Sequence, residues 1–200
     1  MLVGFWARCL SVVDLCLVLT LSVQAQDTVR HTRFSGGMMF HLGYVSGDLK
    51  GADYHAEGMP FGLGGALRFH FFNHLRVGGE GYVSKLSMQH NGSYVRLGWG
   101  GLLVDGYWQL GRWIPYAGFT VGGGSLSSLL IRDGDANDWQ PEPDAVLHNA
   151  AVVLIDPFIG CEFALTKAMH LTFKADYIIP LNSQECPRGV RFYLGFIFAR

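Results

Sequence analysis

Ten charged residues stand at alternate positions within otherwise apolar segments, and their types could form a buried network of ion pairs. The cations are Arg68, Arg76, Arg96, Lys174 and Arg191, and the anions are Glu80, Asp105, Asp156, Glu162 and Asp176. An unpaired buried charge is strongly destabilising, so the equal numbers of the two signs favour pairing. We expect pairs between neighbouring segments: Glu80 between Arg68 and Arg96, Glu162 with Lys174, and Asp176 with Arg191.

Other chemistry has less support in the residue pattern. His170, Asp176 and Ser183 are the types found in a hydrolytic triad, but no serine lies in a nucleophile motif. The 8 histidines show no metal-ligand spacing. Acidic residues in segments 48–53 and 133–144 could bind calcium or could be solvated. We therefore expect no catalytic residues, no metal and no cofactor.

Segments of alternating apolar and polar residues must position these charges. A period of two places successive side chains on opposite faces of a β-strand. Turn-forming residues separate the segments, and helical periodicity is absent outside the N-terminal region. The expected strands are 34–44, 61–71, 75–86, 94–110, 113–126, 151–165, 169–180 and 190–200.

The final segment illustrates which face is inside. Its apolar face carries Val190, Phe192, Leu194, Phe196 and Phe198, and its other face carries Arg191. Such an apolar face suits lipid, with the charges turned inward.

The segment 94–110 is the difficult case. An apolar set, Val95, Leu97, Trp99 and Leu103, would face lipid in the same way. Asp105 has the same parity, so it reaches the interior only if a β-bulge between Gly100 and Val104 changes the phase of the strand.

Composition excludes several classes of protein. The chain is 50% apolar with a mean hydropathy of +0.22, and only 16% of its residues are charged, against about 25% in ordinary globular domains. After residue 25 no apolar run reaches the ~20 residues that a spanning helix needs. A closed β-barrel is the remaining way to satisfy the backbone in lipid. The net charge of -1 gives no indication of a nucleic-acid partner.

The connections alternate in length along the chain. Short turns are expected at 72–74, 111–112 and 166–168, and longer loops at 45–60, 87–93, 127–150 and 181–189. Outer-membrane barrels have short periplasmic turns and long external loops. We expect loop 127–150, the longest, to be mobile and external and to be the first choice of site for an external ligand.

The N-terminal segment has the layout of a secretory signal peptide. An apolar run, Leu15 to Val23, precedes Val23-Gln24-Ala25, which predicts cleavage after Ala25. The barrel would then occupy residues 26–200. Its two cysteines, Cys161 and Cys186, are expected at opposite ends of the barrel and hence free, because a disulfide needs Cα atoms within about 7 Å.

Three stretches carry a resemblance to a known family. They are PYAGFTVGGG (115–124), GCEFALTKAMHLTFKADY (160–177) and RFYLGFIFAR (191–200). The chain resembles the small eight-stranded outer-membrane β-barrels of the OmpA and OmpX type. The resemblance implies an all-β fold, an eight-stranded antiparallel transmembrane up-and-down barrel located in the cell outer membrane.

The closing stretch also resembles the C-terminal signal that the barrel-assembly machinery recognises. The resemblance assigns that signal to Phe192, Leu194, Phe196 and Phe198. The sequence departs from the pattern by ending in Phe-Ala-Arg rather than in Phe. The partners it implies are outer-membrane lipid and the assembly machinery.

Three functions are compatible with an eight-stranded outer-membrane barrel of this sequence. An eight-stranded barrel is only wide enough for side chains or one small ligand, and balanced charges favour a plugged polar lumen. We therefore expect a structural or surface-binding protein that acts through its external loops. A small porin-like transporter is the alternative, and an envelope-lipid-modifying enzyme has less support.

Overall fold

The computed structural model describes residues 34–49, 54–71, 74–87, 93–132, 144–182 and 186–199. These residues form ten antiparallel strands of a single sheet. The signal peptide expected at 1–25 lies outside the described residues. The strands are β1 (Phe34–Leu49), β2 (Tyr54–Gly58), β3 (Phe61–Phe71), β4 (Leu75–Ser87), β5 (Tyr94–Tyr107), β6 (Trp113–Arg132), β7 (Asp144–Ala164), β8 (Met169–Tyr177), β9 (Ile179–Pro180) and β10 (Arg188–Ala199).

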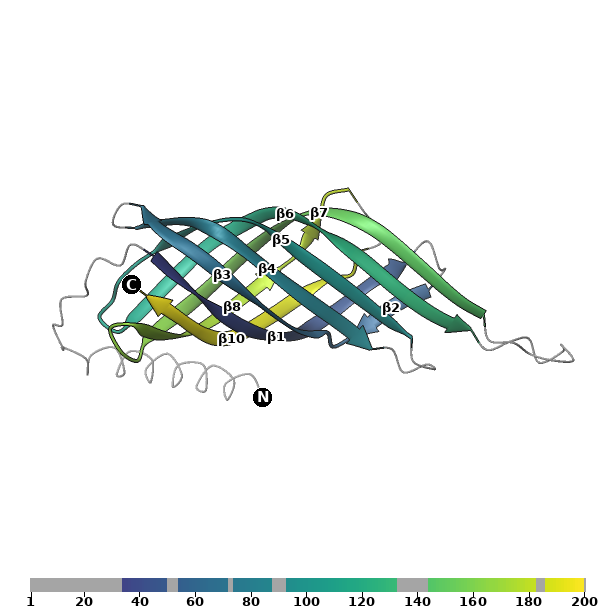
Figure 1. Cartoon of the computed structure of the whole chain (residues 1–200), viewed down its shortest axis with the longest axis horizontal. Helices are drawn as coiled ribbons and strands as arrows, with labels where there is room; N and C mark the ends of the chain where they lie inside the picture. The colour runs from purple at the N-terminus through teal and green to yellow at the C-terminus, as the bar shows by residue number, and fades with distance from the viewer. Residues whose placement is uncertain are drawn as a thin grey trace, which may run out of the picture.

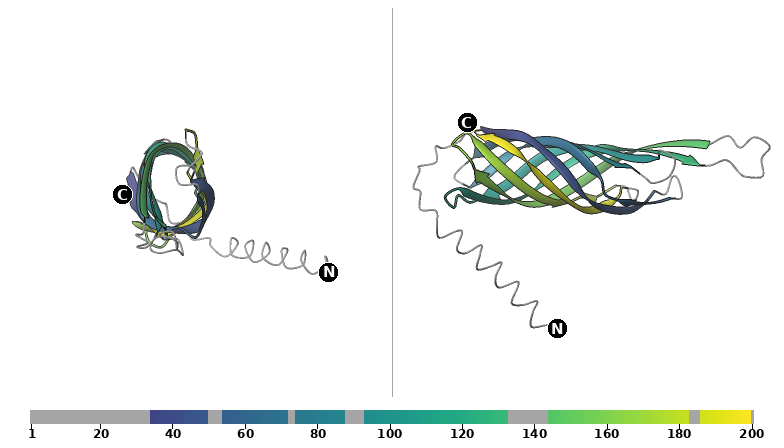
Figure 2. Two further views of the ribbon diagram at one scale, coloured as in Figure 1. Left: turned by 90° about the vertical axis from the view of Figure 1, so that its right-hand side faces the viewer. Right: turned by 90° about the horizontal axis from the view of Figure 1, so that it is seen from below.

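The sheet closes on itself. Each of the longer strands pairs with its neighbours in the chain, and β10 pairs with both β8 and β1. The closing ladder runs from Ser35 opposite Ala199 to Ser46 opposite Arg188. Viewed end-on, the strands form a ring, and from the side they wind obliquely around it (Figures 1 and 2). The eight-stranded up-and-down barrel expected from the sequence is confirmed.

Two short strands add to the eight that build the barrel. β2 pairs with the far end of β1, from Val45 opposite Gly58 to Leu49 opposite Tyr54. β9 continues β8 along β7 after the break at Ile178. The prediction of an unbroken loop over 45–60 was therefore wrong, because β1 continues past Tyr44 and folds back on itself as a hairpin.

The connections separate the two ends of the barrel. The turns after β3, β5 and β7 are short, and they lie at the same end as Phe34 and Ala199, which we call the short-turn end. Between β5 and β6, Leu110 and Trp113 exchange backbone hydrogen bonds of 2.8 Å and 3.1 Å. Gly111 has a φ of 65° there, a conformation that tight two-residue hairpins require and that glycine adopts without strain.

The opposite end, which we call the hairpin end, is dominated by β6 and β7. These two strands stay paired as far as Arg132 opposite Asp144, and they project beyond the other strands (Figure 2, right). The sequence predicted a loop from 127 to 150. That extent was wrong, because β6 and β7 stay paired through both flanks of this segment, and only 133–143 lie outside the described residues.

The two faces of the sheet differ in chemistry. The outer face presents large exposed apolar side chains, among them Phe40 at 69%, Leu102 at 73% and Ile159 at 66% exposure. The inner face carries buried side chains, both charged and apolar. No helix within the described ranges is long and apolar enough to cross a membrane. The apolar face of β10 predicted to meet lipid is the outer face, since Phe192, Phe196 and Phe198 are about half exposed and Arg191 is buried.

Candidate functional site

The barrel interior holds nine of the ten charged side chains singled out in the sequence. Their exposed fractions lie between 0% and 6%. They are Arg68, Arg76, Glu80, Asp105, Asp156, Glu162, Lys174, Asp176 and Arg191. Each is on the inward parity of its strand, so the simple alternation of the sequence is what places it in the lumen.

Arg96 is the exception and requires a correction. Its side chain is exposed on the outer face of β5, directly opposite Lys85 of β4. The strand pairs with β4 and β6 in unbroken register, so the expected bulge is absent from it. Leu97 and Trp99 accordingly point inward in phase with Asp105, and all three are buried.

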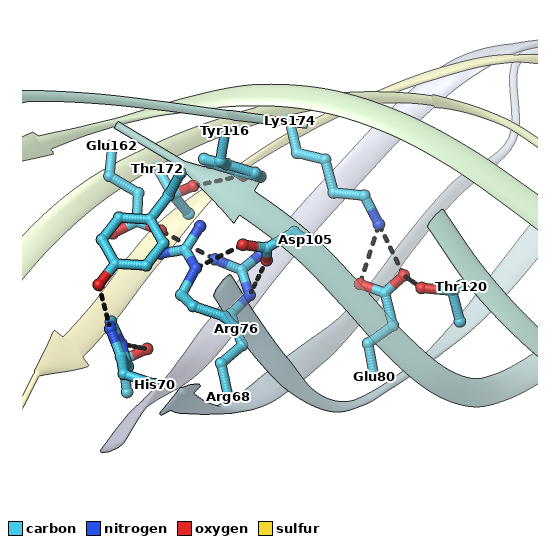
Figure 3. Close-up of polar contacts among 12 residues, drawn as sticks. Arg68, His70, Arg76, Glu80, Asp105, Tyr116, Thr120, Glu162, Thr172 and Lys174 are labelled. Carbon is cyan, nitrogen blue, oxygen red and sulfur yellow. Dashed lines mark hydrogen bonds and ion pairs between the residues drawn. The ribbon is translucent and has the colours of Figure 1, made fainter. Parts of the chain in front are cut away.

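The first group of charges, which we call the arginine cluster, is drawn in Figure 3. It lies toward the short-turn end, close to where β3, β5 and β7 end and β4 begins. Glu162 Oε1 accepts hydrogen bonds from Arg68 Nη1 at 2.8 Å and from Arg76 Nη1 at 2.7 Å. Asp105 binds Arg76 Nε at 2.6 Å and lies 3.4 Å from Arg68 Nε. His170 Nδ1 is 3.0 Å from the other Glu162 oxygen. Two carboxylates thus hold two guanidinium groups.

Aromatic rings support the arginine cluster. The guanidinium of Arg68 lies 4.8 Å from the centroid of Tyr116, and that of Arg76 lies 4.8 Å from Tyr107 and 5.0 Å from Tyr116. The hydroxyl of Tyr116 in turn is hydrogen-bonded to Thr172 at 2.9 Å. Cation–π contacts of this kind strengthen when water is excluded, so the rings both fill the lumen and stabilise the charges.

The second group, which we call the lysine cluster, lies at mid-barrel. Lys174 Nζ donates to both oxygens of Glu80, at 2.8 Å and 2.9 Å. It also lies 3.6 Å from Asp156 and 3.6 Å from Asp176. Thr120 donates a further hydrogen bond of 2.6 Å to Glu80. One ammonium group therefore serves three carboxylates.

Four rings surround the same ammonium group. Lys174 Nζ lies 4.4 Å from the ring centroid of Phe158, 4.9 Å from Tyr193, 5.3 Å from Tyr82 and 5.9 Å from Trp99. These rings come from four different strands. They fill part of the cross-section of the barrel at this level.

Arg76 on β4 binds Asp105, its register partner on the adjacent strand β5, whereas other ion pairs cross the lumen. Lys174 on β8 reaches Glu80 on β4, and Arg68 on β3 reaches Glu162 on β7; each pair joins strands on opposite sides of the ring. The expected pairs of Glu80 with Arg68 and Arg96 and of Glu162 with Lys174 are therefore wrong. Asp176 does stand opposite Arg191 in register, but its ion pair is with Lys174.

The half of the lumen toward the hairpin end is mostly apolar, which the sequence did not lead us to expect. Most of its inward side chains are aliphatic and at most 4% exposed, namely Val45, Leu86, Val95, Leu97, Leu126, Val152, Leu154 and Ile178, with Ser84, Ser128 and Arg191 buried among them. A cavity of about 20 Å³ remains between some of them, with Ser84 and Arg191 also on its wall. That is room for about one water molecule. The lumen expected to be polar throughout is thus mostly aliphatic toward the hairpin end.

The catalytic alternatives find no assembled site. His170 and Asp176 lie six residues apart on one strand, a separation of about 20 Å, and Ser183 is outside the described residues. His170 contacts Glu162 and Asp176 contacts Lys174. Within the ranges that the structure covers, no group of three or more His, Cys, Asp or Glu residues could hold a metal ion.

The hairpin end offers a different kind of site, an open strand edge. Asn182 caps β7 where β9 stops: its Oδ1 accepts from the Val153 N–H at 2.6 Å, and its Nδ2 donates to the Ala151 carbonyl at 3.2 Å. From Asp144 to Ala150, β7 pairs only with β6 among the described residues. Alternate backbone groups along this edge face away from β6.

Comparisons with known proteins identify the fold. No family model and no curated protein matches the chain. The crystal structure of Ail, the attachment invasion locus protein of Yersinia pestis, is similar with a TM-score of 0.54 at 9% identity, over 84% of this chain and 99% of that chain. The crystal structure of Neisserial surface protein A is similar with a TM-score of 0.55 at 11% identity, over 84% and 98%.

A second Ail structure matches as well. It is described as a complex with the heparin analogue sucrose octasulfate, and it has a TM-score of 0.50 at 10% identity, over 84% of this chain and 99% of that chain. These neighbours are small eight-stranded outer-membrane β-barrels. By its fold this chain is a barrel of the same class, and its apolar outer wall agrees with the outer-membrane location expected from the sequence.

Proposed function

We propose that this protein is a sealed outer-membrane barrel that acts at the cell surface through the β6–β7 hairpin. The observation that carries the proposal is the contrast between the side chains that occupy the lumen and the hairpin that projects from the barrel. Buried charged, aromatic and aliphatic side chains occupy the lumen at the levels described above, whereas β6 and β7 extend together to Arg132 and Asp144 beyond the rest of the barrel. Outer-membrane barrels direct their longer connections to the outside of the cell, so the hairpin would face the surroundings.

The packing of the lumen supports a non-conducting barrel. The lysine cluster and its four rings occupy one level of the lumen, and mostly aliphatic side chains occupy the next, around a cavity of about 20 Å³. A water-filled pore needs a continuous polar path, and a mostly aliphatic level disfavours one. The transporter alternative therefore has no observation in its favour.

The open edge of β7 supports a binding role for the hairpin. An extended peptide can add a strand to such an edge through main-chain hydrogen bonds. Native edges are usually protected by lysine, proline or a bulge, and the segment Asp144–Ala150 contains no lysine and no proline. The exposed side chains of Leu147 and Asn149 would contact the added strand.

Charge indicates what kind of partner would suit the hairpin. The connection 133–143 contains Asp133, Asp135, Asp138 and Glu142 and no Lys, Arg or His. Ail, the neighbour whose name includes attachment, was crystallised with a polyanion. An acidic hairpin would repel a polyanion, so the surface we propose here is for neutral or basic protein segments.

Two measurements test the proposal. Purified protein in planar bilayers should show no steady conductance. Intact cells that display the protein should attach to surfaces coated with basic polypeptide, and the Leu147→Pro variant should lose this attachment while keeping its fold, because proline is tolerated where the N–H faces away from the sheet. Leu147→Ala retains the N–H and serves as the control. Stable conductance, or attachment that is unchanged by Leu147→Pro, would refute the corresponding half of the proposal.

Assembly of the barrel is a separate proposal. Phe192, Leu194, Phe196 and Phe198 share the outer face of β10 and are 47% to 58% exposed. These are the residues that the resemblance assigns to the assembly signal, and their common orientation leaves them available to the barrel-assembly machinery before the barrel is surrounded by lipid.

A further inference from the structure

Lys85 and Arg96 form an unusual pair on the outer wall. They stand directly opposite each other on β4 and β5, and both side chains are exposed. Like charges in directly opposed positions destabilise a sheet. Among the described residues neither makes an ion pair with a carboxylate. Lys85 Nζ instead lies 5.1 Å from the ring centroid of Tyr94.

The height of this pair on the barrel matches the edge of the membrane. With a rise of about 3.4 Å per residue and a tilt of about 40°, the chain from Leu75 to Lys85 climbs roughly 26 Å along the barrel axis. The apolar band of such barrels is about 25 Å tall. Exposed aromatic residues near the same rim, Tyr44 and Phe61, agree with this level, since aromatic girdles mark the interface. The two cations therefore lie where lipid headgroups lie.

On the short-turn side of the pair, glycines replace larger residues on the outer wall. In register beneath Lys85 and Arg96 lies a row of outward glycines that crosses three strands, namely Gly81, Gly100 and Gly123, with Gly98 one level closer to Arg96. These glycines line a shallow depression of about 660 Å³, bordered by Met38, Leu63 and Val83.

The packing of the barrel does not account for all of these glycines. A Cβ placed on Gly98 would meet no heavy atom within 4 Å, and one on Gly81 would come no closer than 3.5 Å to the Trp99 carbonyl. Inward glycines of the same strands differ: a Cβ on Gly101 would lie 2.3 Å from the Val121 carbonyl, and one on Gly124 would lie 2.2 Å from that of Gly98. Packing within the barrel therefore gives no reason for glycine at Gly81 and Gly98.

We propose that Lys85, Arg96 and the glycine depression beneath them form a binding site for a phosphate-bearing membrane lipid. The guanidinium and ammonium groups hold the phosphate, which removes the repulsion between them. An acyl chain lies against the bare backbone at Gly81, Gly98, Gly100 and Gly123. The charges select the headgroup, and the depression explains why the ligand is a lipid rather than a soluble anion.

Native mass spectrometry of the purified full-length barrel tests this site. The protein in detergent is titrated with phosphatidylglycerol, with uncharged diacylglycerol and with inorganic phosphate. Phosphatidylglycerol should remain bound, and the Lys85→Gln/Arg96→Gln variant should weaken its retention at least about tenfold, because two charge-assisted contacts are lost. Gly98→Leu, which fills the depression without an internal clash, should weaken retention several-fold with both charges intact.

Matched controls make the same kinds of substitution elsewhere on the barrel surface. Arg112→Gln/Lys167→Gln deletes two exposed charges at the short-turn end, and Ala117→Leu adds the same bulk to another part of the outer wall; neither should change retention. Heat-modified gel mobility verifies that each variant is folded. Equal retention of diacylglycerol, unaltered retention by the Lys85→Gln/Arg96→Gln variant, or binding of inorganic phosphate as tight as that of the lipid would each overturn the proposal.

Discussion

Lys174 and Glu80 are 94 residues apart in the chain and meet across the full width of the barrel, with Nζ 2.8 Å and 2.9 Å from the two carboxylate oxygens. Both side chains are inaccessible to solvent. The pair is one contact within an unequal group, because Lys174 is also the counter-ion of Asp156 and Asp176. Replacing Lys174 should therefore change the stability of the barrel by a different amount from replacing Glu80.

Loss of the lysine should be far more damaging than loss of the glutamate. Lys174→Met leaves three buried carboxylates without their cation, and breaking a buried pair in this way costs about 3–5 kcal/mol. Glu80→Gln keeps the hydrogen-bonding shape and leaves Lys174 with two carboxylates, so its cost should be much smaller. The unfolding temperature, followed by heat-modified gel mobility, measures both.

An exposed lysine provides the control for that comparison. Lys167 lies in the turn before β8 and is exposed, so Lys167→Met should leave the unfolding temperature nearly unchanged. If Glu80→Gln proved as destabilising as Lys174→Met, the description of Lys174 as the shared counter-ion would be incorrect.

The faces of most strands could be predicted because their two sides differ in polarity. On β8, His170, Thr172, Lys174 and Asp176 alternate with apolar residues, and all four are buried in the lumen. On β5 the same reasoning failed, because the half of the lumen toward the hairpin end is itself mostly aliphatic. Hydropathy alone cannot distinguish a side chain packed inside a barrel from one in lipid.

A better signal was present in β5. Leu97, Trp99, Leu103 and Asp105 share one parity, so an unbroken strand needed no bulge, and Arg96 was the residue out of phase. The ion pairs could not be predicted for a different reason. Period-two reasoning assigns a face to each residue, but it does not say which of the strands across the lumen a long side chain reaches.

Two glycines that are close in the structure should respond differently to the same substitution. A Cβ on Gly124 would meet the Gly98 carbonyl at 2.2 Å and Trp99 Cβ at 2.8 Å, whereas one on Gly98 would meet nothing within 4 Å. Gly124→Ala should therefore cost about 1–3 kcal/mol through overpacking. Gly98→Ala should be neutral or stabilising by up to about 1 kcal/mol, since alanine loses less backbone entropy. Chemical denaturation in detergent compares the two.

The two thiols should be free but unequal in reactivity. Neither Cys161 nor Cys186 is in a disulfide. Cys186 is only 1% exposed, so a reagent reaches its sulfur slowly, whereas Cys161 is less deeply buried. A lipid-soluble maleimide should label Cys161 on the outer wall faster than Cys186. After denaturation without reductant both should react, and a protein that gave no free thiols at that point would contradict the structure.

The N-terminal processing predicted from the sequence can be checked directly. Residues 1–25 should be absent from protein isolated from the outer membrane, and its first residue should be Gln26 or lie within a few residues of it. Intact-mass measurement and N-terminal sequencing give the answer. A chain that retained Met1 would show that the segment is not a cleaved signal.

The ladder that joins Ser35 to Ala199 has a consequence for how the molecule is made. The backbone edge of β1 has no other strand to pair with, so it stays open until β10, the last strand along the chain, has been synthesised. At translation rates of about 5–20 residues per second, that delay is on the order of ten seconds. Until this ladder forms, the backbone edges of both β1 and β10 are open to pairing with another chain.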